Sequence, residues 1–320
     1  MAFYFSNLIL QTATEKIFNN LHVLDGAMST ELEKRGVATN NKLWTAKALI
    51  DDIEAIYEVH SAYLKAGAQM ILTNTYQANV YAFERLGYSR RQAETLIAIG
   101  ILVAKKARDD YELETGKHAV VAATIGPYGA YLADGSEYKG DYLLNTAQYL
   151  DFHVSRLQTI LKQDPDCLAL ETQPKLSEPL AILEWLKQKQ STLPVYVSFT
   201  LQDEKTLSDG TKLQEAVKKV ASYPQVFAVG VNCVAPDLVE KAIKTIRQVT
   251  TKKIIVYPNL GSVYDPTTKT WQKSDNTLPF TQLVAKWHTA GADIIGGCCT
   301  TTTEQIEQIA AYFKDEQKNK

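Results

Sequence analysis

Near its carboxyl end the sequence reads Asp293-Ile-Ile-Gly-Gly-Cys-Cys-Thr-Thr-Thr302. An apolar, β-branched run that meets two glycines predicts a short buried strand ending in a tight bend. Two adjacent thiolates do not easily bridge to each other, because disulfide geometry is demanding. They can bind one soft metal ion when a third ligand comes from elsewhere. A second strand-like run, Val229-Gly-Val-Asn-Cys233, also ends in a cysteine and offers that third thiol.

The overall composition is that of an ordinary folded domain. Of the 320 residues, 45% are hydrophobic and 22% are charged, and the formal net charge is -2. This charge gives no basic field for nucleic acid or for a membrane surface, and no stretch approaches the roughly 18 apolar residues needed to cross a bilayer. The apolar run Phe3–Leu10 lacks the cationic start and cleavage site of a signal peptide. Four cysteines argue against a disulfide framework, so we expect a cytoplasmic protein. From the charge and the short apolar runs we expect no nucleic-acid or membrane partner.

Eight apolar runs alternate with helical patterns along the chain. The runs are short and continuous, as in parallel strands covered on both faces, and they lie at residues 22–28, 69–76, 118–126, 167–172, 194–200, 226–233, 253–259 and 292–298. Helices are expected at 29–36, 44–67, 79–86, 90–113, 142–163, 178–189, 212–222, 237–249, 281–290 and 303–314. We expect Ser89 to be one N-cap and Gly67 to close one helix.

This alternation predicts an α/β protein with a (β/α)8 TIM-type barrel. Linkers, charge blocks and low-complexity segments are missing from the sequence. We therefore expect a single domain over residues 1–320, with a leading helix over residues 1–20.

The predicted strand ends gather the reactive residues. In such a barrel the active site forms at the carboxyl ends of the strands, and Cys233, Cys298 and Cys299 each fall just past one of these ends. Cys167 lies early in its strand, so it is expected in the core. Three thiolates with one open position suit Zn²⁺, and the sequence shows no fourth ligand that would close a structural site.

Two carboxylates fall on the same edge. A free amino acid needs an anion for its ammonium group and donors for its carboxylate. Asp25 and Glu171 each end a predicted strand, and the backbone N–H of Gly26 can approach a ligand closely because glycine has no side chain. The alternative for Asp25 is that it caps the helix predicted at 29–36.

Eight short motifs, in order over nearly the whole chain, resemble the zinc-dependent homocysteine S-methyltransferase family. They are Asp25-Gly-Ala-Met-Ser-Thr-Glu-Leu32, Leu43-Trp-Thr-Ala46, Thr73-Asn-Thr-Tyr-Gln-Ala78, Gly126-Pro-Tyr-Gly-Ala-Tyr131, Glu171-Thr172, Gly230-Val-Asn-Cys233, Tyr257-Pro-Asn259 and Gly296-Gly-Cys-Cys-Thr300. The Gly-Gly-Cys-Cys and Val-Asn-Cys elements are specific when they occur together. The sequence departs from the family at 300–302, where members more often show a basic residue and a proline. We expect this to affect the start of the last helix and not the metal.

The resemblance implies a (β/α)8 fold with zinc on the three cysteines and the homocysteine sulfur as fourth ligand. It also implies that Asp25 and Glu171 hold the amino-acid end of homocysteine, and we place Gly26 and Asn232 beside them. The predicted reaction is methyl transfer to homocysteine, giving methionine. A free thiol, with its pKa of about 8.5, is mostly protonated at neutral pH, so zinc would supply the reactive thiolate. No protein acid or base is required.

The sequence leaves the identity of the methyl donor open between several compounds. A sulfonium such as S-methylmethionine or S-adenosylmethionine carries a charge that aromatic faces attract. The expected donor-binding residues are Thr75, Tyr76, Tyr128, Phe199 and Tyr257. The long segment 127–138, rich in Gly and Tyr, is of a kind that often forms a lid. Betaine is the alternative donor within the family, and a zinc or thiol protein without methyl transfer is the alternative outside it. His60, His153 and His288 lie on helical patterns and are expected as surface or packing residues.

Overall fold

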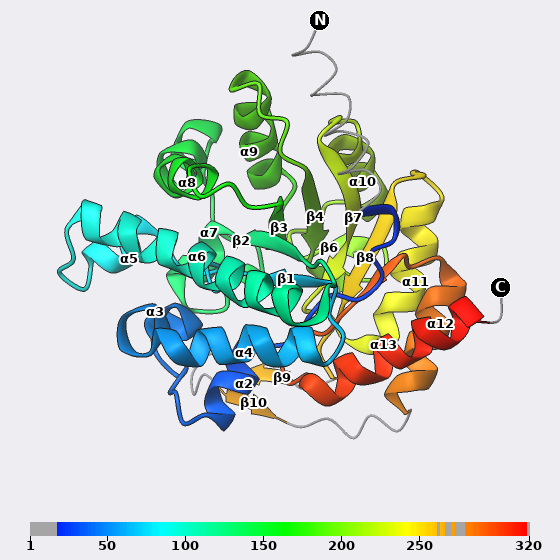
Figure 1. Ribbon diagram of the computed structural model, residues 1–320. Helices are drawn as coiled ribbons and strands as arrows, with labels where there is room; N and C mark the ends of the chain where they lie inside the picture. Colours follow the sequence, from blue (N-terminus) through cyan, green and yellow to red (C-terminus); the bar gives the residue numbers. More distant parts are fainter. Residues whose placement is uncertain (1–17, 261–262, 266–269, 273–278, 319–320) are drawn as a thin grey trace, which may run out of the picture.

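The centre of the molecule is a curled sheet of parallel strands (Figure 1). The computed structural model describes residues 18–260, 263–265, 270–272 and 279–318. Neighbouring strands in the sheet all pair in parallel, in the order β1-β2-β3-β4-β7-β8-β11. The strands are β1 (Met70–Leu72), β2 (Val120–Ile125), β3 (Cys167–Gln173), β4 (Val195–Phe199), β7 (Val226–Asn232), β8 (Lys253–Tyr257) and β11 (Ile294–Ile295).

The first predicted strand, residues 22–28, is present only as isolated bridges. Val23 pairs in parallel with Ile295 of β11, and Leu24 pairs with Met70 of β1. The N–H of Leu24 donates to the carbonyl of Ile295 at 2.9 Å, and the N–H of Asp25 donates to that of Met70 at 3.0 Å. The segment therefore touches both outer strands of the sheet. It is shorter than predicted because a helix already begins at residue 28.

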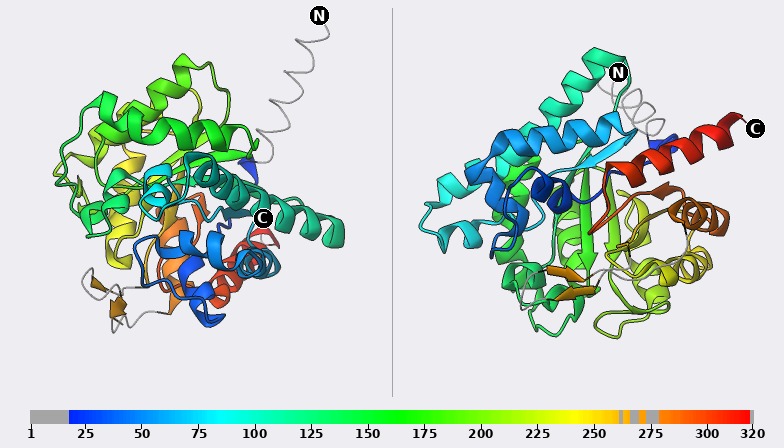
Figure 2. Two further views of the ribbon diagram at one scale, coloured as in Figure 1. Left: turned by 90° about the vertical axis from the view of Figure 1, so that its left-hand side faces the viewer. Right: turned by 90° about the horizontal axis from the view of Figure 1, so that it is seen from below.

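Helices surround the sheet and cover its outer face (Figures 1 and 2). They are α2 (Met28–Lys34), η1 (Trp44–Lys47), α3 (Ala48–Asp51), α4 (Ile53–Lys65), α5 (Val80–Glu84), α6 (Arg90–Thr115), α7 (Tyr128–Leu132), η2 (Ser136–Tyr138), α8 (Thr146–Leu161), α9 (Ser177–Gln188), α10 (Leu213–Ala221), α11 (Pro236–Arg247), α12 (Phe280–Ala290) and α13 (Thr303–Lys318), where η marks a 3₁₀ helix.

Local sequence signals explain where several helices begin and end. The predicted N-cap Ser89 is confirmed, because its side chain and that of Gln92 form a reciprocal capping box at the start of α6. Gly67 follows α4 with φ +104, the left-handed conformation that ends helices. The single helix predicted at 44–67 is wrong. Asp52 leaves helical geometry and accepts the N–H of Ala55, so it caps α4 and separates it from α3.

Both faces of the sheet are buried, as expected for parallel strands. Along β3, Cys167 and Ala169 belong to an inner cluster that includes Met70, Tyr196 and Ile255. The residues that alternate with them, Leu168 and Leu170, belong to the larger cluster under the helices. This alternation confirms Cys167 as a core residue and fixes which side chains at the strand ends turn inward.

The connections contain structure that the sequence did not predict. Two antiparallel hairpins, β5 (Leu201–Asp203) with β6 (Thr206–Leu207) and β9 (Val263–Asp265) with β10 (Thr270–Gln272), lie outside the main sheet. The segment 127–142, called the lid below, contains α7 and η2 and is not a plain loop. The leading helix predicted at residues 1–20 falls almost wholly outside the described residues. Over the part of the chain that the structure describes, the helices are too short or too polar to cross a membrane.

Candidate functional site

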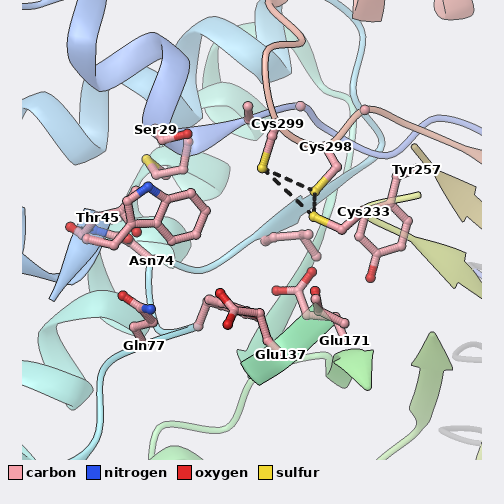
Figure 3. Close-up of a pocket in the computed structure, with 18 of the residues that line it drawn as sticks. Ser29, Thr45, Asn74, Gln77, Glu137, Glu171, Cys233, Tyr257, Cys298 and Cys299 are labelled. Carbon is pink, nitrogen blue, oxygen red and sulfur yellow. Dashed lines mark hydrogen bonds between the residues drawn. The ribbon is translucent and has the colours of Figure 1, made fainter. Parts of the chain in front are cut away.

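A pocket opens at the carboxyl ends of the strands. It holds about 960 Å³ of empty space including its open mouth. It is lined by Glu171 near the end of β3, Cys233 after β7, Tyr257 at the end of β8 and Cys298 after β11. Figure 3 shows the three sulfur atoms gathered on one side, with Glu171 and Tyr257 near them and Gln77 and Thr45 farther away. The predicted position of the site at the strand ends therefore agrees with the structure.

The three cysteines predicted as metal ligands form one cluster. The Sγ atom of Cys299 is 3.8 Å from that of Cys233 and 3.8 Å from that of Cys298, and the Sγ atoms of Cys233 and Cys298 are 2.6 Å apart. All three are free thiols, and they form the one metal-capable group of His, Cys, Asp and Glu side chains found over the described ranges. A tetrahedral metal with Zn–S bonds of about 2.3 Å has sulfur ligands about 3.8 Å apart. Two of the three distances already fit, and the third would open by about 1.2 Å.

Backbone geometry brings these cysteines together. Cys233 has φ +52, a conformation uncommon for a non-glycine residue and typical of functional sites. Its N–H donates to the carbonyl of Tyr257 at 3.2 Å, while the N–H of Cys298 donates to the carbonyl of Pro258 at 2.9 Å. Gly297 must be a glycine, because a Cβ there would overlap the side chain of Thr301. The ends of β7, β8 and β11 therefore converge on the cluster.

The thiols share their protons unequally. The neighbouring thiol of Cys298, followed by that of Cys299, lowers the pKa of Cys233 to about 5. The same contacts with Cys233 raise the pKa values of Cys298 and Cys299. The hydroxyl of Tyr138 also donates to the Cys233 sulfur, at 3.8 Å. The cluster thus resembles one thiolate held by two thiols and a phenol, a charge distribution that a cation would stabilise further.

Asp25 lies 2% exposed beside this cluster. Its Oδ2 accepts the N–H of Leu72 at 2.8 Å, while its Oδ1 is buried without a hydrogen-bond partner among the described residues. Burial raises the pKa of the Asp25 carboxyl well above its usual value. The alternative that Asp25 caps α2 is wrong, since the N-cap position of α2 is Ala27. Asp25 instead has an acceptor left over for a ligand.

Glu171 occupies the matching position at the end of β3. It is 6% exposed, and burial, followed by the neighbouring Cys298, raises the pKa of its carboxyl well above the usual value. Tyr257 opposes this shift through a hydrogen bond to the carboxyl. The Tyr257 hydroxyl is itself fixed at 2.6 Å from Ser198 Oγ and 3.2 Å from the Tyr196 hydroxyl. The Tyr257 hydroxyl beside Glu171 therefore belongs to a preformed hydroxyl chain.

Not every predicted site residue lines the pocket. Gly26, Tyr76 and Tyr257 do, together with Asp25 and Glu171. Four others are absent from the lining: Asn232, Thr75, Tyr128 and Phe199.

These four residues have packing or framework contacts instead. Asn232 accepts the N–H of Thr172 at 2.8 Å and the Ser198 hydroxyl at 2.6 Å, so its carbonyl is already used in the framework. Thr75 donates to the carbonyl of Thr124 at 2.9 Å. Phe199 is fully buried in the outer core, and the ring of Tyr128 packs on Tyr131, Tyr142 and Phe152.

The sequence did not single out several pocket residues. Trp44, Glu137 and Tyr138 all line the pocket, and the Trp44 ring meets that of Tyr76 edge-on at 5.8 Å between centroids. Trp44 lies in one of the eight motifs and Tyr138 lies in the Gly- and Tyr-rich segment 127–138, but only tertiary folding turns their side chains inward. Positive φ at Trp44 (+50) was not visible in the sequence.

A parallel sheet covered by helices, with three thiols and two buried carboxylates in a pocket at its strand ends, defines an α/β enzyme whose pocket can hold a metal on thiolates. The chain matches the homocysteine S-methyltransferase family over residues 22–313. It is 40% identical over 299 residues to "Homocysteine S-methyltransferase YbgG" of Bacillus subtilis, covering 92% of this chain and 95% of that protein. It is 41% identical over 292 residues to "Homocysteine S-methyltransferase" of Escherichia coli, covering 90% and 94%.

Among solved structures, the metallated form of the homocysteine methyltransferase MmuM from Escherichia coli superposes with a TM-score of 0.82 at 39% identity, covering 91% of this chain and 96% of that one. The chain therefore belongs to the homocysteine S-methyltransferase family, a family of methyltransferases.

Proposed function

We propose that this protein transfers a methyl group from a sulfonium donor to the sulfur of homocysteine, giving methionine. The observation that carries this proposal is the cluster of Cys233, Cys298 and Cys299 inside the strand-end pocket. Sulfur-to-sulfur distances of 3.8 Å suit a tetrahedral ion with one position left for a ligand. Family membership supports the same reading.

We propose Zn²⁺ as the resident ion, because three thiolates form a soft donor set that suits zinc. Bound zinc would lower the pKa of the homocysteine thiol, so that its sulfur reacts as a thiolate near neutral pH. The protein's own part is to present the three thiolates from two chain segments, at Cys233 and at 298–299, and to keep the remaining position facing the pocket. The hydroxyl of Tyr138, near the Cys233 sulfur, would help to hold the Cys233 thiolate in place.

Asp25 and Glu171 are proposed to bind the ammonium group of homocysteine. Both are buried and line the same pocket as the thiols. Burial raises the pKa of both carboxyls, so their negative charge is poorly compensated when no ligand is bound. An approaching ammonium group would stabilise the ionised form. We propose that Gly26 adds a backbone contact nearby. Asn232 would act indirectly, because it holds the backbone of Thr172 next to Glu171.

The donor would lie over the bound sulfur, against aromatic faces. Tyr76 and Tyr257 line the pocket, and so do Trp44 and Tyr138. A sulfonium is a poorly hydrated cation that such faces attract. In the transfer step the homocysteine sulfur forms a bond to the methyl carbon while the donor's S–CH₃ bond breaks. The bonding pair stays on the donor sulfur, which leaves as a neutral thioether. The step needs no protein acid or base.

Three broader expectations complete the proposal. Residues 22–25 would act as the eighth strand and close the barrel, supported by their bridges to β11 and β1. The chain would form one domain over residues 1–320. A reducing compartment such as the cytoplasm would suit the site, because free thiols are needed to hold the ion.

The deciding experiment is a methyl-transfer assay. The zinc-loaded protein is incubated with homocysteine and with S-methylmethionine, S-adenosylmethionine or betaine separately, and methionine is quantified. We expect S-methylmethionine to support much faster methionine formation than betaine. Turnover with betaine and none with either sulfonium would overturn the donor assignment and leave the metal chemistry intact.

A further inference from the structure

A chain of three buried, polar side chains lies behind the pocket and touches none of the thiols. It consists of Glu178 near the start of α9 and His153 and Arg156 on consecutive turns of α8. Glu178 and His153 are 0% exposed and Arg156 is 1% exposed. Such a group is expensive to bury, so its contacts need an explanation.

Glu178 holds both ends of the lid. Its Oε1 accepts the N–H of Tyr128, at the start of α7, at 2.6 Å, and its Oε2 accepts the hydroxyl of Tyr142, beyond η2, at 2.6 Å. Glu137 and Tyr138 lie between these two anchors and line the pocket. One carboxylate therefore closes the lid into a loop whose middle faces the site.

Arg156 holds the neighbouring wall. Its guanidinium donates to the carbonyl of Gly126 at 2.7 Å and to the carbonyl of Tyr76 at 3.3 Å. The Tyr76 carbonyl also accepts the N–H of Gly126 at 3.1 Å. Gly126 cannot carry a side chain, because a Cβ there would lie 2.7 Å from the ring of Tyr76. The position of this pocket aromatic is thus set from behind by Arg156.

His153 joins the two halves. Its Nδ1 is 2.7 Å from Arg156 Nη2 and its Nε2 is 2.7 Å from Glu178 Oε1. Since a guanidinium only donates, Nδ1 accepts and Nε2 carries the proton that it donates to Glu178. Burial, followed by the charge of Arg156, lowers the pKa of His153 to about 4, so the imidazole is neutral near pH 7.

We propose that Glu178, His153 and Arg156 form a positioning network that holds the lid and Tyr76 in place for the methyl donor. The role rests on the proposed function, because it assigns these two walls to the donor. Stability alone does not require such a network, since apolar residues of similar volume often stabilise a core equally well. The network instead fixes two pocket segments relative to one another, the lid and the segment that carries Tyr76.

The test compares Glu178→Gln with the milder Tyr142→Phe, which removes only the bond at the far end of the lid. The matched control is Tyr149→Phe, which removes a hydroxyl contact to Ser177 between the same two helices, at 3.3 Å. Three quantities are measured on zinc-loaded protein: the KM of the sulfonium donor, the Kd of homocysteine, and amide hydrogen exchange of the lid without substrates.

We expect Glu178→Gln to raise the donor KM at least tenfold and to accelerate lid exchange, with the homocysteine Kd changed less than twofold. Tyr142→Phe should move both quantities in the same direction by a smaller factor, and Tyr149→Phe should move neither. An unchanged donor KM in Glu178→Gln, or equal losses for donor and homocysteine, would overturn the positioning role. Unchanged lid exchange would overturn it as well, whatever the activity.

The exchange measurement separates this inference from the proposed function. If the unaltered protein forms no methionine from any donor, the proposed function fails. Faster lid exchange in Glu178→Gln would still support the network as the element that holds the lid.

Discussion

Replacing Glu171 with Gln should weaken the binding of homocysteine while leaving the metal in place. The substitution keeps the size of the side chain and removes its charge. Glu171 is buried at the end of β3 and near Cys298, so an ammonium group bound there would be largely shielded from water. The sulfurs of the cysteine cluster contact one another and the hydroxyl of Tyr138, so removing the charge of Glu171 should leave the zinc content unchanged.

The expected size of the effect follows from the contact that is lost. A hydrogen bond to a charged group contributes about 1.5–3 kcal/mol. Since about 1.4 kcal/mol corresponds to a tenfold change in affinity, the homocysteine Kd should rise by about 10- to 150-fold. The amide of Gln can still accept one hydrogen bond, which favours the lower part of this range.

The assay is calorimetric titration of zinc-loaded protein with homocysteine, with zinc per chain measured on the same samples. Glu240→Gln, on the partly exposed face of α11, is a control for the loss of a carboxylate far from the pocket. Homocysteine affinity unchanged within twofold in Glu171→Gln would refute the reasoning. A loss of zinc in that variant would show that Glu171 supports the metal site instead.

Three other outcomes are expected. Cys233→Ala should lower zinc from about one ion per chain to nearly none and abolish methyl transfer, whereas Cys167→Ala should keep both; full zinc retention in Cys233→Ala would contradict the ligand assignment. Tyr76→Ala should raise the donor KM by about 2- to 30-fold, the equivalent of 0.5–2 kcal/mol of cation–π attraction, with homocysteine affinity preserved in the same titration. Burial lowers the pKa of His60 to about 3. Below about pH 6.5 the unfolded chain therefore binds a proton at His60 that the folded chain does not bind. The free energy of unfolding should therefore fall between about pH 6.5 and pH 3 by up to about 5 kcal/mol, and denaturant titrations of His60→Leu should show a flatter profile.

The sequence predicted the parts of the site that follow from strand ends. Cys233, Cys298 and Cys299 each come just after an apolar run, and parallel strands bring such positions to one edge. The same reasoning placed Asp25 and Glu171 in the pocket. The strand pattern also predicted the seven strands of the main sheet and the burial of Cys167 in the core.

Other features depend on contacts between distant segments. The sequence did not reveal which aromatic residues face the pocket. Tyr128 and Tyr138 lie in the same segment, but of the two only Tyr138 lines the pocket. The helical pattern around His153 also predicted only an ordinary surface or packing residue. The partners of His153 are Arg156, which is close in sequence, and Glu178, which the next helix brings into reach. No local period marks such a meeting point.

The anchoring of both lid ends on Glu178 has a consequence for how the pocket could be altered. A loop whose two ends are pinned at one place can change length between them at little entropic cost, since closure entropy grows slowly with length. The segment between Tyr128 and Tyr142 should therefore tolerate insertions, provided that the hydrogen bonds to the carbonyls of Ala130 and Glu137 are kept. Inserting residues there, with Tyr128, Tyr138 and Tyr142 retained, offers a way to reshape the lid and admit bulkier cations without disturbing the sheet or the contact with Cys233.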